Sequence, residues 1–277
     1  MTASFIWQLK NNLETDEKMK FNPGFNIRPT TQPMGFEYGQ DVFGPKVENR
    51  TLDSIRKSLH DPQCSGPDPV YAIAMDVGKS EHLPILKRLH LLYGAVTYAA
   101  GKLGNEPVRS QGHIHKISPL SGWSTPEVYE IWSGKAIIYM QETAEDQPGR
   151  CFAIIAHPGD VVIVPPYWAH ATISTDPEQP LTFGAWCDRE YGFEYDAVRA
   201  HKGLAWFPAI SVNGAIEWNK NLNYLDCELV VKRPEIYNQF AIEPGKSIYS
   251  QFEENLFRFE FVPHPQMVAE KWKGFTP

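Results

Sequence analysis

Three histidines and one glutamate are of the residue types that hold a divalent metal ion. His113 and His115 lie two residues apart in QGHIH, Glu127 follows in PEVYEIW, and His170 comes later in VPPYWAHATIS. Side chains alternate across a strand, so we expect His113 and His115 on one face of the chain. Three imidazoles with one carboxylate suit a borderline divalent metal and leave positions open for water or a ligand.

The strand predicted around Glu127 carries a tyrosine on the same face. Glu127, Tyr129 and Ile131 alternate, whereas Glu130 falls on the opposite face. Tyr129 could offer its hydroxyl beside Glu127, or pack as a buried aromatic residue. The remaining histidines are expected to be hydrogen-bonded core or surface residues: His60, His82, His90, His157, His201 and His264.

The segments that carry these residues are expected to be short strands separated by turns. VYAIAMDV and RLHLLYGAVTYAAG supply two, and VYEIWSGKAIIYMQE supplies two more, joined by a tight turn at Ser133 and Gly134. CFAIIAHPGDVVIVPP and LTFGAWC continue the pattern. Strands at this spacing, with no long helical pattern between them, indicate a sandwich or barrel, so the sequence predicts an all-β fold.

Three parts of one domain are expected along the chain. Residues 1–69 are predicted to form an extended arm, rich in proline and glycine, that ends with a short amphipathic helix over residues 51–60 and packs on the barrel. Thr51 is the candidate N-cap of that helix. Residues 70–210 are predicted to form the barrel itself.

The tail, residues 211–277, looks too short for a second barrel. SVNGAIEW carries a hairpin turn at Asn213 and Gly214. LFRFEFV alternates three phenylalanines with Arg258 and Glu260, which is typical of a strand. We therefore expect a strand-rich C-terminal extension of the same domain.

Composition limits the class of partner. The chain has 26 Lys and Arg against 33 Asp and Glu, a net charge of −7, and no run of basic residues that would follow a phosphate backbone, so a nucleic acid is not expected. No stretch approaches the roughly 20 apolar residues that span a bilayer. The N-terminal segment is interrupted by Gln8, Lys10 and Glu14 and lacks the apolar core of a secretory signal.

Cysteine usage favours a reducing compartment. The four cysteines form no CxxC pair, which fits reduced thiols in a cytoplasmic protein better than a disulfide framework. Each is expected to act as a small buried apolar residue. They are Cys64, Cys151, Cys187 and Cys227.

The frame around the metal-type residues resembles the two motifs of the cupin superfamily. His113, His115 and Glu127, with Gly134 after Glu127, follow the first motif, and the spacing from Gly159 through Pro165 to His170 follows the second. The resemblance covers residues 94–195. It implies a double-stranded β-helix, a barrel of the jelly-roll kind, with a metal held by His113, His115, Glu127 and His170.

The chain departs from those motifs in three places. Eleven residues separate His115 from Glu127 where a typical cupin has three or four, so residues 116–126 are expected to bulge out as a loop. Tyr167 replaces the second motif's glycine, and Ser174 replaces its final asparagine.

Four stretches are similar to the cupin-type glucose-6-phosphate isomerases: GHIH, TPEVYEIWSGKAIIYMQ, PGDVVIVPPYWAHATI and YGFEYDAVRAHKG. The resemblance implies an aldose–ketose isomerase for glucose 6-phosphate and fructose 6-phosphate. It gives Glu127 the role of the base that moves a proton between carbons 1 and 2, with a direct hydride shift as the competing route. It places Tyr195 against the sugar, although a tyrosine at a strand end can also simply pack, and Tyr129, on the same face as Glu127, could hydrogen-bond the sugar.

The phosphate contacts implied by the resemblance are Ser110, the N–H of Gly112, and Thr97. The family's upstream threonine aligns on Val96, however, and Cys187 and Phe193 replace a tyrosine and a histidine of the family. Arg109 could compensate as a phosphate clamp.

Two alternatives stay open. One is an isomerase or epimerase of another, unphosphorylated sugar, and the other is a non-enzymatic sugar-binding cupin, since this fold hosts many functions. The implied cofactor is one divalent transition metal per subunit, iron(II) first, with manganese, zinc or nickel as alternatives. By analogy with the family we expect a homodimer, a small-molecule partner and no membrane.

Overall fold

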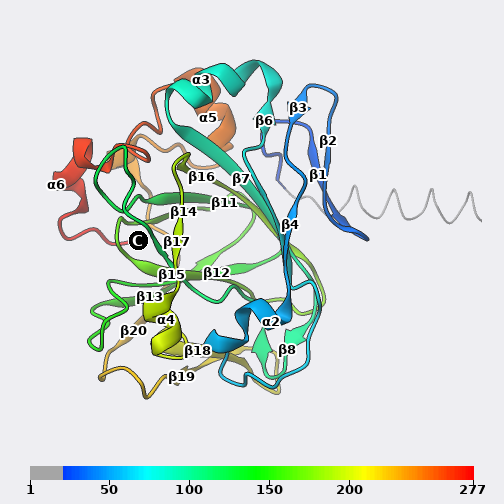
Figure 1. Ribbon diagram of the computed structural model, residues 1–277, viewed down its shortest axis with the longest axis vertical. Coiled ribbons are helices and arrows are strands. Elements are labelled where there is room, and N and C mark those ends of the chain that lie inside the picture. The colour runs from blue at the N-terminus through cyan, green and yellow to red at the C-terminus, as the bar shows by residue number, and fades with distance from the viewer. Residues whose placement is uncertain (1–20) are drawn as a thin grey trace, which may run out of the picture.

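Two β-sheets packed face to face form the body of the molecule (Figure 1). The structure is a computed structural model that describes residues 21–277, so the interrupted N-terminal segment lies outside the described residues. The six-stranded sheet runs β14 (Val161–Val164), β11 (Glu127–Ser133), β16 (Leu181–Asp188), β7 (Leu91–Tyr98), β5 (Tyr71–Met75) and β4 (Glu48–Arg50). The four-stranded sheet runs β15 (Ala169–Ser174), β12 (Ala136–Gln141), β13 (Cys151–Ala156) and β20 (Leu229–Lys232).

Apolar side chains from both sheets fill the space between them. Tyr129 and Ile131 of β11 pack in the same buried cluster as Ile138 of β12 and Ile154 of β13. Alternation along each strand sends every second side chain into this interior. The predicted all-β barrel of the double-stranded β-helix type is confirmed.

The tight turn predicted after Ser133 has a larger role than joining two neighbouring strands. β11 and β12 belong to different sheets and do not pair, so the turn carries the chain across the barrel. Gly134 adopts φ +79° there, and a Cβ at this position would lie 2.7 Å from the carbonyl oxygen of Pro180. Glycine is required at this crossing, because both the positive φ and the close approach exclude a side chain.

The arm supplies an edge strand and the predicted short helix. β1 (Ile27–Thr31) pairs with β2 (Met34–Tyr38), β3 (Val42–Phe43) pairs with β6 (Gly78–Lys79), and β4 joins the barrel beside β5. Helix α2 (Leu52–Ile55) and the 3-10 turn η1 (Arg56–Ser58) follow. The Thr51 hydroxyl caps α2, since it accepts from Ser54 N–H at 3.3 Å, as its sequence predicted.

The tail is strand-rich only in its first part. β18 (Trp206–Ile210) and β19 (Ile216–Lys220) form the predicted hairpin, and β20 adds a parallel edge strand. The strand expected in LFRFEFV is wrong. Successive backbone bonds from Arg258 N to Asn255 O, Glu260 N to Phe257 O and Val262 N to Phe259 O wind this segment into turns.

A physical reason for that miss lies in the aromatic partners of the segment. Phe259 packs on Trp186 with ring centroids 5.5 Å apart, whereas Phe261 packs on Phe240 at 4.7 Å. Local turns satisfy the backbone and let the two rings diverge toward different partners. The alternation of phenylalanine with charged residues therefore results from the burial of two phenylalanines within turns. It does not indicate one face of a strand.

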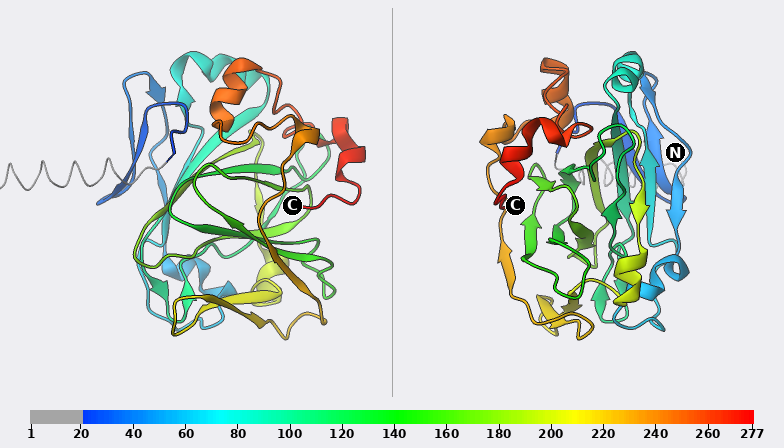
Figure 2. Two further views of the ribbon diagram at one scale, coloured as in Figure 1. Left: turned by 180° about the vertical axis from the view of Figure 1, so that it is seen from behind. Right: turned by 60° about the vertical axis from the view of Figure 1, so that its left-hand side comes forward.

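The tail covers the outer face of the six-stranded sheet. Trp186 of β16 stacks on Tyr249 of α5 (Ile248–Glu254) at 5.5 Å, and its indole N–H donates to the Ile248 carbonyl at 3.2 Å. Figure 2 shows this tail, in orange and red, on the outside of the barrel. This outer layer shields the outer face of the six-stranded sheet from solvent. A site for a ligand is therefore expected in the barrel interior.

Shorter elements complete the described chain. None of the helices within residues 21–277 is long and apolar enough to cross a membrane. The short strands are β8 (Lys102–Leu103), β9 (Glu106–Pro107), β10 (Ile114–His115) and β17 (Phe193–Glu194). The helical turns are η2 (Ser80–His82), α3 (Leu83–Arg88), α4 (Asp196–Ala200), η3 (Asn238–Phe240), η4 (Pro265–Val268) and α6 (Ala269–Trp272).

Candidate metal centre

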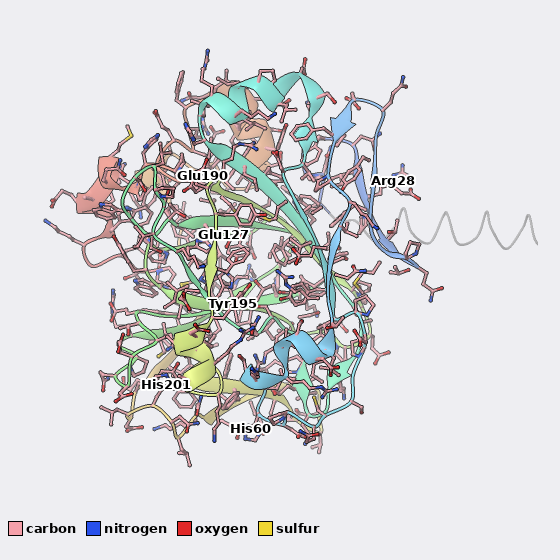
Figure 3. The ribbon with its side chains drawn as sticks, viewed as in Figure 1. Arg28, His60, Glu127, Glu190, Tyr195 and His201 are labelled. Atoms are coloured by element: carbon pink, nitrogen blue, oxygen red, sulfur yellow. The ribbon has the colours of Figure 1, made fainter. Side chains whose placement is uncertain are left out.

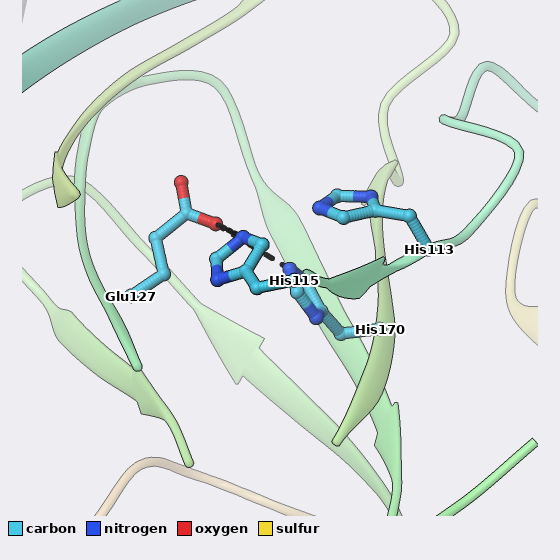
Figure 4. Close-up of side chains that lie close together, drawn as sticks. All are labelled: His113, His115, Glu127 and His170. Carbon is cyan, nitrogen blue, oxygen red and sulfur yellow. Dashed lines mark hydrogen bonds and ion pairs between the residues drawn. The ribbon is translucent and has the colours of Figure 1, made fainter. Parts of the chain in front are cut away.

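The four metal-type side chains converge inside the barrel (Figure 4). One ligand atom from each of His113, His115, Glu127 and His170 lies within 4.8 Å of the others. His115 Nε2 is 3.2 Å and His170 Nε2 is 3.4 Å from the same Glu127 oxygen, Oε2. Residues far apart in the sequence therefore form one cluster, as their spacing predicted.

Backbone pairing fixes two of the histidines to each other. His113 N–H donates to the His170 carbonyl at 3.0 Å, and His170 N–H donates to the His113 carbonyl at 2.9 Å. This reciprocal bridge joins the segment before β10 to strand β15. The closing of the barrel thus brings the two halves of the motif together.

Hydrogen bonds at the far nitrogens aim two imidazoles at the cluster. His115 Nδ1 lies 2.8 Å from the Thr125 carbonyl oxygen, and His170 Nδ1 lies 3.1 Å from the Trp168 carbonyl oxygen. A carbonyl can only accept, so Nδ1 carries the proton and Nε2 keeps its lone pair. This is the orientation that outer hydrogen bonds give to histidines that ligate metals.

The cluster fits a cation because the Nε2 lone pairs of its imidazoles meet no hydrogen-bond donor among residues 21–277. His113 Nε2 is buried and makes no hydrogen bond with the described residues. The Nε2 lone pairs of His115 and His170 face a carboxylate oxygen, which repels them unless a proton or a metal ion lies between. A divalent metal would satisfy all three imidazoles and the carboxylate together.

Burial and charges inside the cluster favour the protonation states that a metal requires at His113, His170 and Glu127, but not at His115. Burial lowers the pKa of His113 and of His170, and neighbouring imidazoles add to the effect. Burial opposes ionisation of Glu127, but its contacts with His115 and His170 outweigh that and hold its pKa well below the usual range. Burial also opposes the charge on His115, whose pKa is nevertheless raised by Glu127.

Two further side chains hold Glu127 in place. The Tyr129 hydroxyl donates to Oε2 at 2.7 Å, and the Cys187 thiol donates to Oε1 at 3.3 Å. Tyr129 therefore points into the barrel, as predicted, with its hydroxyl already bonded to the carboxylate. Cys187 was expected only as a buried apolar residue, although its alternation with Ala185 on β16 places it on the barrel side.

Three of the residues expected to contact substrate differ in their hydrogen bonding and in their place relative to the metal-type cluster. Gly112 is buried and adopts φ +90°, and its N–H makes no hydrogen bond with the described residues. The Ser110 hydroxyl is buried and accepts from Thr172 N–H at 3.1 Å. The ring of Tyr195 lies 6.0 Å from that of His113, at the edge of the cluster (Figure 3).

Thr97 and Arg109 do not face the cluster. The Thr97 hydroxyl bonds to that of Thr182 at 3.2 Å on the outer face of β7, because alternation sends Tyr98 into the barrel instead. The Arg109 guanidinium is buried against Glu106 at 2.7 Å and also donates to the Ser58 carbonyl at 2.7 Å. Neither the phosphate contact of Thr97 nor the clamp of Arg109 is therefore proposed further.

The loop at residues 116–126 is found where it was expected. A bridge between Ile117 and Ser124 closes its base, and the Ser124 hydroxyl accepts from Tyr167 N–H at 3.0 Å. Tyr167, in the motif's glycine position, keeps a positive φ of +72°. Such a backbone is uncommon outside glycine and is held here by this contact with the loop.

Arg50 is a cation near the cluster that the sequence did not indicate. It pairs across strands with Tyr71, whose ring faces the barrel and stacks on Tyr98 at 4.8 Å. Burial raises the pKa of Tyr195, and the charge of Arg50 partly offsets that rise. Only the docking of the arm as an edge strand brings Arg50 here, so no local pattern could have revealed it.

A comparison with protein families identifies the family to which the chain belongs. The family model described as glucose-6-phosphate isomerase matches residues 56–226, more than half of the sequence. The chain belongs to the glucose-6-phosphate isomerase family. All four converging residues lie within the part that matches this family, whereas Arg50 and most of the tail lie outside it.

Relatives in the glucose-6-phosphate isomerase family match part of the chain. The enzyme of that name from Thermococcus litoralis is 38% identical over 105 residues, which cover 38% of this chain and 50% of the relative. That from Pyrococcus horikoshii is 36% identical over 117 residues, which cover 42% and 56%. The chain thus spans about half the length of these curated relatives.

Solved structures of similar shape align over about half of this chain. An oxalate oxidase aligns with a TM-score of 0.34 at 12% identity, over 45% of this chain and 54% of that one. A Bacillus subtilis oxalate decarboxylase variant aligns with a TM-score of 0.33 at 16% identity, over 56% and 31%.

Proposed function

We propose that the protein is a metal-dependent aldose–ketose isomerase that interconverts glucose 6-phosphate and fructose 6-phosphate. The observation that carries the proposal is Glu127 held among three imidazoles, with one ligand atom of each within 4.8 Å of the others, inside the part of the chain that matches the isomerase family. We further propose iron(II) as the metal, ahead of manganese, zinc or nickel, and a cytoplasmic homodimer.

The residues divide the work of such a reaction among them. A divalent metal held by His113, His115, Glu127 and His170 would act as a Lewis acid toward the oxygens on carbons 1 and 2. Glu127 would carry the proton between those carbons, and Tyr129 would hold its carboxylate in position. Phe193, with its ring 4.5 Å from that of His113, would shield that side of the cluster from water.

The low pKa of Glu127 bears on the route of the hydrogen. A carboxylate stabilised by two imidazoles and by the Tyr129 hydroxyl is a weak base. A direct hydride shift between carbons 1 and 2 therefore stays in competition with proton transfer. The two routes differ in whether hydrogen from the solvent enters the product.

The phosphate end of the substrate would be held by the Gly112 N–H and by cations near Tyr195. The Gly112 N–H makes no hydrogen bond with residues 21–277, and Arg50 and Arg199 both lie beside Tyr195. An arginine can bind a phosphate through two parallel N–H donors. These residues would bind the phosphate in place of Thr97, whose hydroxyl faces away from the cluster.

A second candidate is an isomerase or epimerase of an unphosphorylated sugar. It is favoured by the outward orientation of Thr97 and by the replacement of two polar family residues by Cys187 and Phe193. The two candidates differ in whether turnover requires a phosphate group on the substrate.

Proton NMR of fructose 6-phosphate in heavy water tests the proposal. The protein would be stripped with a chelator and reloaded without oxygen with iron(II) or manganese(II). We expect glucose 6-phosphate to form only after reloading, and deuterium at carbon 2 would favour proton transfer. Protein that binds either metal but gives no turnover would contradict the phosphorylated substrate and direct the search to free sugars.

A further inference from the structure

A cavity of about 730 Å³ with basic walls lies beside the metal centre, and its lining contains none of the four metal-type residues. Five cationic side chains line it, and they come from three segments: the end of α2 and η1, the end of α4, and the end of β19. Among residues 21–277, no Asp or Glu belongs to its lining. The cations are Arg56, Lys57, Arg199, Lys202 and Lys220.

The positive charge of this basic cavity is only partly balanced. Arg56 pairs with Asp53, and Lys220 pairs with Asp226, both outside the lining. Lys57 and Lys202 have no ion pair among residues 21–277, and both are exposed. Cations gathered at one place repel one another, and these stand together in a protein whose net charge is −7.

The floor of the basic cavity suits the carbon part of a small molecule. Leu59 and Phe207 are buried there, and the His60 ring lies 5.1 Å from that of Phe207. Small-molecule sites combine such apolar surface with a few converging polar groups. The volume is within the range of such sites, which is about 300 to 1,000 Å³.

One wall of the basic cavity is shared with the neighbourhood of the metal centre. Arg199 Nε donates to Gln111 Oε1 at 3.1 Å, and the Arg199 guanidinium lies 4.9 Å from the centroid of the Tyr195 ring. These contacts fix Arg199 in one orientation, which reduces the entropy lost when it binds an anion. Lys57 and Lys202 face the cavity without belonging to the metal centre.

We propose that the basic cavity binds a soluble, small phosphate monoester, at a site that shares Arg199 with the proposed sugar site but contains none of the four metal-type residues. The phosphate would lie among Lys57, Lys202 and Arg56, and the carbon skeleton would lie on Phe207 and His60. This site goes beyond the proposed isomerase function. It does not depend on that function, because binding is measured without turnover.

Calorimetric titration with glycerol 3-phosphate tests the proposal on the metal-loaded full chain. This probe carries a phosphate and has no carbonyl to isomerise. The pocket variant is Lys57→Gln with Lys202→Gln, and we expect it to bind the probe at least tenfold more weakly than the wild type. The matched control is Lys87→Gln with Arg88→Gln, which removes the same charge from the exposed surface of α3 and should leave the affinity within twofold.

Two results would overturn the phosphate-ester site. Wild-type affinity in the pocket variant would mean that the probe binds elsewhere, including at the metal centre. An equal loss in the α3 control would mean that net charge alone, and not a built site, attracts the probe. Melting temperatures of both variants within a few degrees of wild type would show that either comparison concerns folded protein.

Discussion

At the scale of single residues, the Glu127 carboxylate shows how the barrel prepares its chemistry. Tyr129 and Cys187 donate to its two oxygens from the same sheet, so the carboxylate is oriented before any ligand arrives. Neighbours of this kind set the affinity and reactivity of a metal site nearly as much as the ligands themselves.

Replacement of Tyr129 by phenylalanine tests this role. The variant keeps the ring in the barrel but removes the 2.7 Å hydrogen bond to Glu127. We expect metal affinity or turnover to fall by about 10- to 100-fold, the usual effect of losing such a partner. Chelator competition would measure the affinity. Tyr139→Phe, which removes a buried hydroxyl bonded to Gln141, is the matched control and should leave both quantities near wild type.

Arg50 offers a second test at this scale. If it holds the phosphate end of the substrate, Arg50→Gln should raise KM for fructose 6-phosphate about tenfold or more, because a charge-assisted bond is worth about 1.5–3 kcal/mol. The turnover number should change little. Arg88→Gln, exposed on α3, controls for the lost charge. An unchanged KM in Arg50→Gln would remove Arg50 from the site.

At the scale of elements, a buried ion pair joins the arm to the barrel. The Glu106 carboxylate on β9 accepts from Arg109 and, at 2.7 Å, from the backbone N–H of His60. Arg109 also donates to the Ser58 carbonyl at the end of η1. The pair therefore positions the segment that carries Lys57 and His60.

Arg109→Ala should destabilise the protein strongly. It would leave Glu106 buried and without its cation, and breaking a buried pair in this way costs about 3–5 kcal/mol. Urea denaturation would measure the loss. Lys102→Ala, exposed on the neighbouring β8, should cost less than about 0.5 kcal/mol. A small loss in Arg109→Ala would show that the pair does not anchor the arm.

Element patterns explain what the sequence could and could not predict. Strands such as β11 and β16 followed from alternation and turn residues, and the converging His and Glu residues followed from motif spacing. The turn structure of residues 256–262 did not, because turns can bury alternate phenylalanines as a strand does. The outward orientation of Thr97 depended on a register that only pairing with β16 fixes. Arg50 and the basic cavity depend on long-range docking.

At the scale of the whole molecule, one buried carboxyl links barrel and tail. Glu130 is fully buried, and its Oε1 accepts from Ile248 N–H at 2.7 Å, at the start of α5. Burial raises its pKa to about 8, although the bonds from Ile248 and Trp132 partly oppose the rise. The folded state therefore favours the protonated form of the Glu130 carboxyl.

A dependence of stability on pH follows from that raised pKa. A group with a higher pKa in the folded than in the unfolded state stabilises fully below the unfolded value, here 4.5, and loses that contribution as pH rises through about 8. We expect the free energy of unfolding to fall by a few kcal/mol between pH 5 and 9. Glu130→Gln should flatten this dependence. Equal pH profiles of the two proteins, measured by urea denaturation, would contradict the role of Glu130.

The loop at residues 116–126 has a consequence for how this barrel can diversify. Its base is closed by the bridge from Ile117 to Ser124, and its end, at Thr125, orients the His115 imidazole. At Gly122, near the tip of the loop, an added Cβ would have no atom of the described residues within 4 Å. The tip can therefore lengthen, shorten or carry an inserted peptide while the imidazole keeps its aim. In evolutionary terms, the rim of the barrel is free to vary while the metal centre stays unchanged.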